Sequence, residues 1–186
     1  MRLSVIAAAL VVAACTGSST PKAVPEPSPA PAFFDPCPTA AGEPVDGGLP
    51  ELKLSCLGKG PKVNLAALRG PLLVNVWGSW CEPCQEEVPH LQDFYTAAKG
   101  KVGLLGIDYN DSKGSAQDFA GHVGMTYPSV FDDDNAIKGR GPFVISGLPM
   151  TVFVDADGKV THVSRGGFKS LAELKTQVAT YLGVQT

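Results

Sequence analysis

Apolar residues recur along the chain in two kinds of spacing, and their order predicts an α/β fold. Residues 72–77 and 102–109 are nearly continuous apolar runs, as in strands that are covered on both faces of a parallel sheet. Between them, apolar residues recur every three or four positions, which predicts an amphipathic helix that begins near Cys81. Its apolar positions are Val88, Leu91, Tyr95 and Ala98. Strand, helix and strand in this order predict a βαβ unit.

Two predicted hairpins extend this unit. Apolar and polar residues alternate weakly at 52–57, and a Gly-Lys-Gly-Pro turn separates this segment from residues 62–64. The pattern predicts a short N-terminal β-hairpin. Apolar and polar residues also alternate at 150–155 and at 159–165, on the two sides of an Ala-Asp-Gly turn. We therefore predict an antiparallel pair of strands there. The expected sheet is therefore central and mixed, and it is flanked by helices.

Two further helices are predicted from capping boxes, in which a serine and an acidic residue three positions later bond to free N–H groups at the helix start. Residues 115–118 predict a helix that runs to about Val123, followed by a short extended piece at 127–131. Residues 170–173 predict the last helix. Its apolar positions are Leu171, Leu174, Val178 and Leu182. We expect this helix to cover the face of the sheet opposite the first helix.

Composition and charge exclude some classes of protein. The chain has 186 residues, of which 44% are hydrophobic, which suits one globular domain with additional segments rather than two large domains. The formal net charge is −3 and the pI is about 5.6, so the chain lacks the basic character of a nucleic-acid-binding protein. We therefore expect no nucleic acid among its partners.

The N-terminus has the features of an export signal followed by a tether. Arg2 and a short apolar run lead to a Val-Ala-Ala-Cys sequence that resembles the lipobox of bacterial lipoproteins, and the run is too short to span a bilayer. We predict a lipoprotein signal peptide at 1–14 and a lipid anchor on Cys15, with ordinary signal cleavage nearby as the alternative. Residues 15–36 are rich in proline and small residues, which predicts an extended linker. The globular domain is expected at 37–186.

Candidate chemistry lies where the first long strand meets the helix, in the sequence Trp-Cys-Glu-Pro-Cys at 80–84. Cysteines at i and i+3 share one helix face, with Cα atoms close enough for a disulfide. Free N–H groups and the dipole at a helix N-terminus favour the Cys81 thiolate, which makes Cys81 the attacking sulfur and Cys84 the resolving one. Half of a zinc site and an inert structural pair are the alternatives, but the sequence has no second Cys-x-x-Cys and no His-x-x-x-His to complete a zinc site. We expect no metal and no cofactor.

The strand, the aromatic-x-x-Trp-Cys-x-Pro-Cys sequence and the helix together resemble the thioredoxin superfamily, and most closely its exported TlpA/ResA-like branch of membrane-tethered thiol–disulfide oxidoreductases. The resemblance implies a thioredoxin-like domain with an N-terminal β-hairpin and the αβ insertion that TlpA-like proteins share with peroxiredoxins. It also implies a disulfide reductase, lipid-anchored at the extracytoplasmic face of the bacterial cell membrane. Its partners would be exported proteins, such as apocytochrome c or copper-site proteins, and a membrane thiol–disulfide electron donor. We expect a monomer.

Export changes the interpretation of the remaining cysteines, because disulfides persist outside the cytoplasm. Without Cys15 four cysteines remain, and four allow three pairings. The Cys-x-x-Cys spacing assigns Cys81 to Cys84 as the redox disulfide and leaves Cys37 with Cys56. We predict that this second pair is a structural disulfide, with free buried thiols and a redox relay as the alternatives.

The resemblance assigns roles to residues around the two sulfurs. Pro149 matches the cis-proline that faces the disulfide in the superfamily, and the backbone of Leu148 would pair with an extended substrate segment. Glu87 matches a glutamate near the cysteines of ResA-like proteins and shares a helix face with Cys84, so we predict a catalytic role in proton transfer to that sulfur. A solvated helix glutamate is the alternative. The expected substrate-facing residues are Trp80, Glu82, Pro83, Leu148 and Pro149.

Two other functions stay open on the sequence alone. The charge of Glu82 should raise the pKa of a nearby thiol and favour a reductant, but a disulfide-forming oxidant for secreted proteins uses the same attack chemistry, and only the redox potential separates the two. A copper metallochaperone of the same fold would hold the metal with thiolates and a His or Met. Such proteins typically space their cysteines more widely and place a histidine before the late strands, whereas this chain has none near Pro149.

Overall fold

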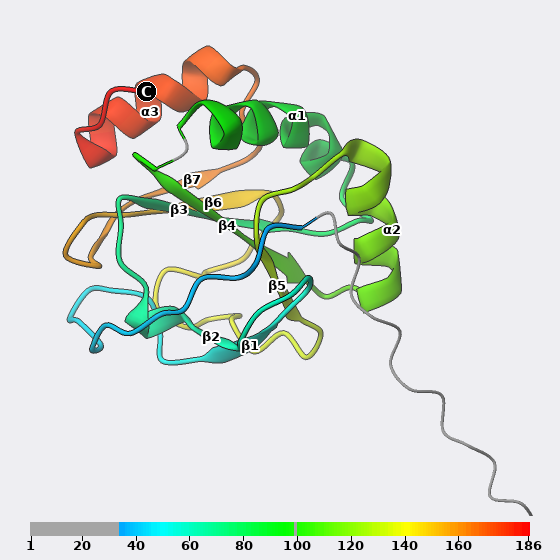
Figure 1. Ribbon diagram of the computed structural model, residues 1–186, viewed down its shortest axis with the longest axis horizontal. Coiled ribbons are helices and arrows are strands. Elements are labelled where there is room, and N and C mark those ends of the chain that lie inside the picture. Colours follow the sequence, from blue (N-terminus) through cyan, green and yellow to red (C-terminus); the bar gives the residue numbers. More distant parts are fainter. Residues whose placement is uncertain (1–33, 99) are drawn as a thin grey trace, which may run out of the picture.

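The computed structural model describes residues 34–98 and 100–186, which form a mixed sheet of seven strands with three α-helices (Figure 1). The predicted signal peptide, Cys15 and nearly all of the predicted linker lie outside these residues. The strand order is β2-β1-β5-β4-β3-β6-β7. The strands are β1 (Lys53–Cys56), β2 (Val63–Asn64), β3 (Leu72–Trp77), β4 (Gly103–Tyr109), β5 (Ser129–Asp132), β6 (Met150–Val154) and β7 (Val160–Arg165).

The centre of the sheet is parallel and its two sides are antiparallel, as the sequence predicted. β4 pairs in parallel with both β3 and β5, so the three strands end at the same edge of the sheet. β6 and β7 form the predicted hairpin beside β3, and β1 and β2 form the predicted N-terminal hairpin beside β5. The α/β fold class is confirmed. The chain segments that follow β3 and β4 therefore meet at one edge, and β6 begins there.

The helices are α1 (Glu82–Ala97), α2 (Lys113–Val123), α3 (Leu171–Leu182) and the 3-10 turn η1 (Leu65–Ala67). The predicted cap of α3 is confirmed at Ser170, whose Oγ accepts a hydrogen bond from the Glu173 N–H at 3.1 Å, while the Glu173 side chain accepts from the Lys169 N–H at 2.8 Å rather than from Ser170. The capping box predicted for α2 was wrong by one turn. Ser112 is the N-cap, and its Oγ accepts from the N–H of Ser115, the residue that we had expected to be the cap.

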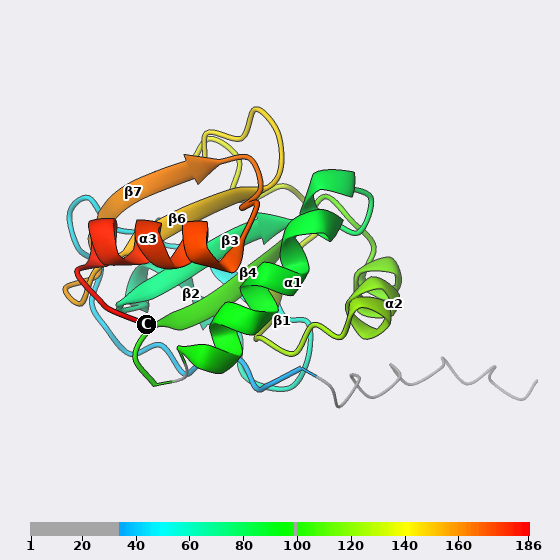
Figure 2. The ribbon, with the colours of Figure 1, turned by 90° about the horizontal axis from the view of Figure 1, so that it is seen from above.

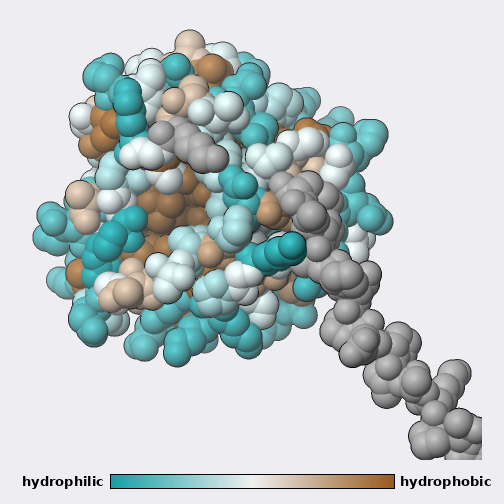
Figure 3. Space-filling model, viewed as in Figure 1, coloured by the Kyte–Doolittle hydropathy of each residue, from teal (hydrophilic) through white to brown (hydrophobic). Residues whose placement is uncertain are grey.

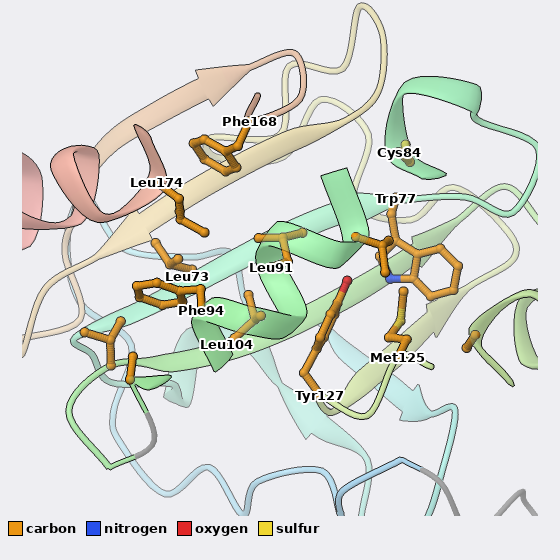
Figure 4. Packing of buried hydrophobic residues seen from close by; sticks show 14 of the residues in the cluster. Leu73, Trp77, Cys84, Leu91, Phe94, Leu104, Met125, Tyr127, Phe168 and Leu174 are labelled. Atoms are coloured by element: carbon orange, nitrogen blue, oxygen red, sulfur yellow. The ribbon is translucent and has the colours of Figure 1, made fainter. Parts of the chain in front are cut away.

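All three α-helices contribute to one core on one face of the sheet, and Figures 1 and 2 show α1 and α3 together on that face. We expected α3 on the opposite face, and this prediction was wrong. After β7 the chain passes the start of α1, where the Phe168 N–H donates to Glu87 Oε2 at 3.2 Å, so α3 begins on the α1 side. Leu174 and Val178 then join the buried cluster that contains Leu73 (Figure 4).

The second face of the sheet is covered by η1 and by irregular segments instead of an α-helix. Its buried cluster includes Leu49 before β1, Leu65 in η1 and Phe143 in the long connection between β5 and β6. These residues pack with the strand residues that face away from α1, such as Val74 and Leu105. Because both faces are covered, β3 and β4 are buried along nearly their whole length, as their continuous apolar sequences predicted.

Candidate active site

β3 carries the chain directly into the Cys-x-x-Cys sequence at the edge where the parallel strands end. Cys81 is the N-cap of α1, and its sulfur accepts a hydrogen bond from the Cys84 N–H at 3.3 Å. The two cysteines form a disulfide with a Cα–Cα distance of 5.2 Å. Cys81 is 4% exposed and Cys84 is fully buried, so Cys81 is the cysteine of the two that keeps contact with solvent. Both features give Cys81 the surroundings of a reactive thiol.

The segment before Cys81 is held by the loop that follows β4. The Ser79 N–H donates to Asp111 Oδ2 at 2.7 Å, and the Trp80 indole N–H donates to the carbonyl oxygen of Asn110 at 3.1 Å. The Gln85 side chain closes the segment from the other side by donating to the Ser79 carbonyl at 2.9 Å. Trp80 is nevertheless 56% exposed, so its ring forms part of the surface beside the cysteines. These bonds fix the approach to Cys81 while leaving an apolar surface free.

Glu87 lies one turn after Cys84 on the inner face of α1 and is 1% exposed. Its Oε1 accepts from the Asn75 side-chain amide at 2.7 Å, and its Oε2 accepts from the Phe168 N–H. Asn75 Nδ2 also donates to Thr151 Oγ1 at 3.0 Å. The carboxyl is thus held by groups from β3 and from the segment after β7, and Thr151 of β6 in turn holds the Asn75 side chain. The alternative of a solvated helix glutamate is wrong, because the side chain is buried.

Burial raises the pKa of Glu87 from 4.5 to about 7, although the hydrogen bonds from Asn75 and Phe168 and the charge of Lys169 partly offset the shift. A carboxyl with this pKa exchanges its proton near neutral pH. Tyr127 is fully buried in the same core, and Figure 4 shows its ring beneath α1. Burial first, and then the charge of Glu87, raise the pKa of Tyr127, so its hydroxyl stays neutral. Glu87 is therefore the group of this pair that can titrate.

Pro149 lies beside the start of α1, and the Leu148–Pro149 peptide bond is cis, as predicted. Gly167 shows how closely the segments meet, because a Cβ on this residue would lie 3.2 Å from the Pro83 carbonyl oxygen, 3.4 Å from Glu87 Cβ and 3.5 Å from Pro149 Cγ. Leu148 is half-buried, while Glu82 and Pro83 are exposed. The structure thus brings Pro83, Glu87 and Pro149 together at one end of the sheet.

The structure joins Cys37 to Cys56, with a Cα–Cα distance of 6.0 Å. Cys56 lies in β1, where it pairs with Val130 of β5. Both cysteines belong to the buried cluster on the face of the sheet that α1 does not cover, whereas Cys81 and Cys84 belong to the cluster on the α1 face. The disulfide therefore ties the segment before β1 to the sheet on the other side from the Cys-x-x-Cys sequence.

Three buried polar residues near the site were not predicted from the sequence, namely Asn75, Asp108 and Thr151. Asn75 and Asp108 each interrupt an apolar strand that otherwise has the composition of a buried one. A single polar residue in such a run is a usable signal, because burying it without a partner costs free energy. Asn75 has its partners in Glu87 and Thr151, while both Asp108 oxygens lack a hydrogen-bond donor among the described residues.

The described residues contain no group of three or more His, Cys, Asp or Glu side chains placed to hold a metal ion. An apolar hollow of about 250 Å³ opens on the side seen in Figure 3, and it lies at the starts of β3 and β4, away from Cys81. Its lining includes Pro36, Pro38, Leu68, Leu72, Leu104 and Pro128. The cysteine pair lies instead at the other end of β3, where Cys84 is fully buried and Cys81 is 4% exposed.

Comparison with known proteins identifies the family. The model of the AhpC/TSA family matches residues 45–163, which is more than half of the chain. The chain belongs to the AhpC/TSA family. Among related proteins, thiol-disulfide oxidoreductase ResA of Bacillus thuringiensis is 29% identical over 126 residues, which cover 67% of this chain and 69% of that protein. Thiol:disulfide interchange protein CycY of Rhizobium leguminosarum is 35% identical over 103 residues, 55% of this chain and 54% of that one.

A solved structure gives the same result for this AhpC/TSA member. A secreted Mycobacterium tuberculosis disulfide oxidoreductase, homologous to E. coli DsbE, superposes with a TM-score of 0.62 at 26% identity, over 70% of this chain and 96% of that one. The predicted resemblance and the thioredoxin-like fold are confirmed. The chain is a thiol–disulfide oxidoreductase. None of the helices among the described residues has the length and apolar character needed to cross a membrane.

Proposed function

We propose that the protein is an extracytoplasmic, membrane-tethered disulfide reductase that acts on exported proteins through Cys81 and Cys84. The observation that carries the proposal is the asymmetry of the two sulfurs. Cys81 is at the helix N-terminus and partly accessible, while Cys84 is fully buried and one helical turn from the Glu87 carboxyl. One sulfur is placed to attack a client, and the other to react only within the protein.

In the first step the Cys81 thiolate attacks one sulfur of a client disulfide. The client S–S bond breaks, a mixed disulfide forms between Cys81 and the client, and the second client sulfur leaves as a thiolate that takes a proton from water. The helix N-terminus stabilises the attacking thiolate before the step. An extended client segment would lie beside Leu148 and Pro149 and pack on the exposed ring of Trp80.

In the second step Cys84 resolves the mixed disulfide. Its thiol gives a proton to the Glu87 carboxylate, and the resulting thiolate attacks Cys81, so that the Cys81–Cys84 disulfide forms and the client sulfur leaves. The net reaction moves two electrons from the Cys81–Cys84 dithiol to the client disulfide. The pKa of about 7 suits Glu87 to this role, because the carboxyl is partly ionised at neutral pH and can still hold the proton that it receives.

The proposed direction and location rest on the related proteins and on the sequence. Relatives named ResA and CycY are thiol–disulfide oxidoreductase and interchange proteins, and the M. tuberculosis neighbour is a secreted one. The signal at 1–14, a lipid on Cys15 and the linker at 15–36 would place the domain outside the cytoplasm and on the membrane. A membrane thiol–disulfide carrier would then re-reduce Cys81–Cys84. The proposed clients are exported proteins, with apocytochrome c and copper-site proteins as the candidates.

The central experiment traps the mixed disulfide. A tagged Cys84→Ala variant of the full chain in its native host should accumulate clients bound to Cys81, because the resolving thiolate is missing. Mass spectrometry after purification under denaturing conditions identifies the clients and the client cysteine. The matched control is the double variant Cys81→Ser/Cys84→Ala, which should capture none of them. Equal capture by both variants would contradict the proposed mechanism.

A second measurement decides the direction. The redox potential of the Cys81–Cys84 pair is measured by equilibration with glutathione or dithiothreitol buffers and thiol trapping. A reductase should have a potential near about −270 mV, whereas a value near about −120 mV would identify a disulfide-forming oxidant. Copper titration of the reduced protein tests the remaining alternative, because stoichiometric tight binding that Cys81→Ser abolishes would indicate a metallochaperone instead.

A further inference from the structure

A second buried carboxyl, that of Asp108, lies beneath the segment that leads to Cys81. Asp108 is near the end of β4 and is fully buried. It is the register partner of Trp77 in β3, and side chains that are neighbours across parallel strands point to the same face of a sheet. Trp77 packs in the core under α1, so the Asp108 carboxyl is on the α1 side of the sheet as well.

The Asp111 carboxyl lies close enough to that of Asp108 to share a hydrogen bond with it, and hydrogen-bond donors are distributed unequally between the two. Asp111 accepts from two backbone N–H groups, those of Ser79 and Ser112, each at 2.7 Å. Neither oxygen of Asp108 has a donor among the described residues. Two N–H donors stabilise a carboxylate, and a buried carboxyl without donors is stabilised by a proton. The charge of the pair therefore belongs on Asp111 and the proton on Asp108, which can donate it in a hydrogen bond to Asp111.

The surroundings of Asp108 favour this distribution. Burial first, and then the charge of Asp111, a hydrogen bond with it and the charge of Asp132, raise the pKa of Asp108 to about 8. Asp132, at the end of β5, is the register partner of Tyr109 and so points to the other face of the sheet, whereas α1 contributes Glu87 to the face of Asp108. The groups that shift the pKa of Asp108 include no cation. At neutral pH the pair thus carries one negative charge rather than two.

The pair is linked to the active-site segment through the turn after β4. Asn110 has a φ of +54°, a left-handed conformation that asparagine tolerates better than most residues, and the chain turns back there. The turn places Asp111 against the Ser79 N–H and the Asn110 carbonyl against the Trp80 indole. Ser79 is two residues before Cys81, so the position of Asp111 determines how the chain enters the N-terminus of α1.

We propose that Asp108 is a positioning residue for Cys81, because its proton joins it to Asp111 and thereby holds Ser79 and the N-terminus of α1 in place. The inference rests on the proposed role of Cys81 as the attacking thiolate. When Asp108 loses its proton, two adjacent carboxylates repel each other and the bond from Ser79 to Asp111 is strained. A further negative charge also lies under the active-site segment. Both effects disfavour ionisation of Cys81, so less of the attacking thiolate forms at a given pH.

The test measures how fast iodoacetamide alkylates Cys81 in the reduced full-length protein between about pH 6 and pH 9.5, across the alkaline loss of the Asp108 proton. Mass spectrometry assigns the alkylated cysteine, and the rate at each pH follows the fraction of Cys81 that is present as thiolate. In the wild type, the rate should rise less steeply above pH 8 than a single ionisation predicts, because the added charge makes ionisation of Cys81 about fivefold less favourable. Asp108→Asn keeps an N–H that can bond to Asp111 but cannot ionise, so its rate should follow a single ionisation curve.

Two further variants separate positioning from general damage. Asp108→Ala removes the bond to Asp111 and should lower the rate below that of Asp108→Asn at every pH. Asp118→Asn removes a charge from an exposed position on α2 and should follow the wild type. A wild-type profile that Asp108→Asn reproduces unchanged would overturn the inference. Alkylation of Cys84 in preference to Cys81 in the wild type would instead overturn the proposed function, and the inference with it.

Discussion

The Asn75 side-chain amide donates a hydrogen bond to Glu87 Oε1 at 2.7 Å, across the interface between the central strand β3 and α1. Among the described residues, this is the shortest hydrogen bond that the Glu87 carboxyl accepts. The same amide group donates to Thr151 of β6, so Asn75 is oriented from both neighbouring elements. Burial raises the pKa of Glu87, and the hydrogen bond from Asn75 lowers it again in part. Asn75 thus lowers the pH at which Glu87 becomes a base.

Glu87→Gln should slow the resolving step without abolishing attack by Cys81. The amide keeps the size of the side chain but cannot accept the Cys84 proton, so formation of the Cys81–Cys84 disulfide should be slower by about a hundredfold near pH 7.5, the lower end of the range for general base catalysis. Quenched-flow measurement with oxidised glutathione separates the mixed disulfide from the closed one. The wild-type resolving rate should rise through about pH 7, where Glu87 ionises, and this rise should be absent in the variant.

The matched control for this variant is Glu86→Gln. Glu86 is the exposed neighbour of Glu87, and its carboxylate lies 3.7 Å from the Lys169 ammonium. Removing its charge should change the resolving rate by less than about twofold, because exposed ion pairs contribute little. If Glu86→Gln slowed resolution as much as Glu87→Gln, general charge near the cysteines would explain the effect rather than proton transfer to Glu87.

Asn75→Ala should move the pH profile of the resolving step to higher pH. Without the amide, the Glu87 carboxylate loses a hydrogen bond that stabilises its charge, so the pKa of Glu87 rises above about 7 and less of the base is ionised at neutral pH. Thr151→Val removes the other partner of Asn75 but leaves the bond to Glu87, so it should shift the profile less. A pH titration of the Glu87 carboxyl by ¹³C NMR reports the same pKa directly, and an unchanged value in Asn75→Ala would contradict this role.

The stability of the oxidised protein should fall as the pH rises from about 5 to 8. The raised pKa of Glu87 means that, between its ordinary value of 4.5 and about 7, the folded protein holds a proton that the unfolded chain has lost. Unfolding then releases a proton, and the free energy of unfolding decreases by up to about 1.4 kcal/mol per pH unit in that window. Urea unfolding at several pH values should show a decline that is smaller by about 2 kcal/mol in Glu87→Gln. The raised pKa of Asp108 also makes the free energy of unfolding decrease with pH, and it does so in both the wild type and Glu87→Gln. Parallel pH curves would argue against the raised pKa.

The sequence predicted those parts of the fold that local patterns determine. β3 and β4 are continuous apolar runs, the β6–β7 hairpin has its turn sequence, and α3 has its capping box, so each element was found near its observed bounds. The Cys-x-x-Cys sequence predicted its own helix start, because the spacing places both sulfurs on one face. Local patterns do not state which face of a sheet a helix covers, and α3 was placed on the wrong one. Its side is set by the segment at Phe168, which contacts Glu87 from far along the chain.

The candidate site was predicted only in part for the same reason. Cys81, Cys84 and Glu87 lie on one helix, where residue spacing determines their geometry. Asn75 and Asp108 act through contacts between strands and loops, and only their polarity within apolar runs indicated anything unusual. Whether a buried polar side chain has a partner depends on tertiary contacts. Asn75 has its partners, whereas neither oxygen of Asp108 has a donor among the described residues.

Cys15→Ala should release the protein from the membrane. The variant lacks the sulfur that would carry the lipid, and no described helix can replace the anchor by spanning a membrane. Fractionation of the native host should find the wild-type chain with the membranes and the variant in the soluble extracytoplasmic fraction or the medium. Metabolic labelling with an alkyne fatty acid should mark the wild type alone. A variant that stays in the membrane fraction would mean that something other than Cys15 tethers the chain.

Replacing the Cys37–Cys56 pair by alanines should destabilise the protein while leaving the chemistry at Cys81 intact. The disulfide closes a loop of 19 residues, and by the chain-entropy estimate such a loop contributes about 3 kcal/mol. Both sulfurs lie in the core on the far face of the sheet, so the geometry around Cys81 does not depend on them. Urea unfolding should show the loss, and the redox potential and alkylation rate of Cys81 should stay within about twofold of the wild type at 25 °C. A changed potential with unchanged stability would instead indicate that Cys37 and Cys56 exchange electrons with the active site.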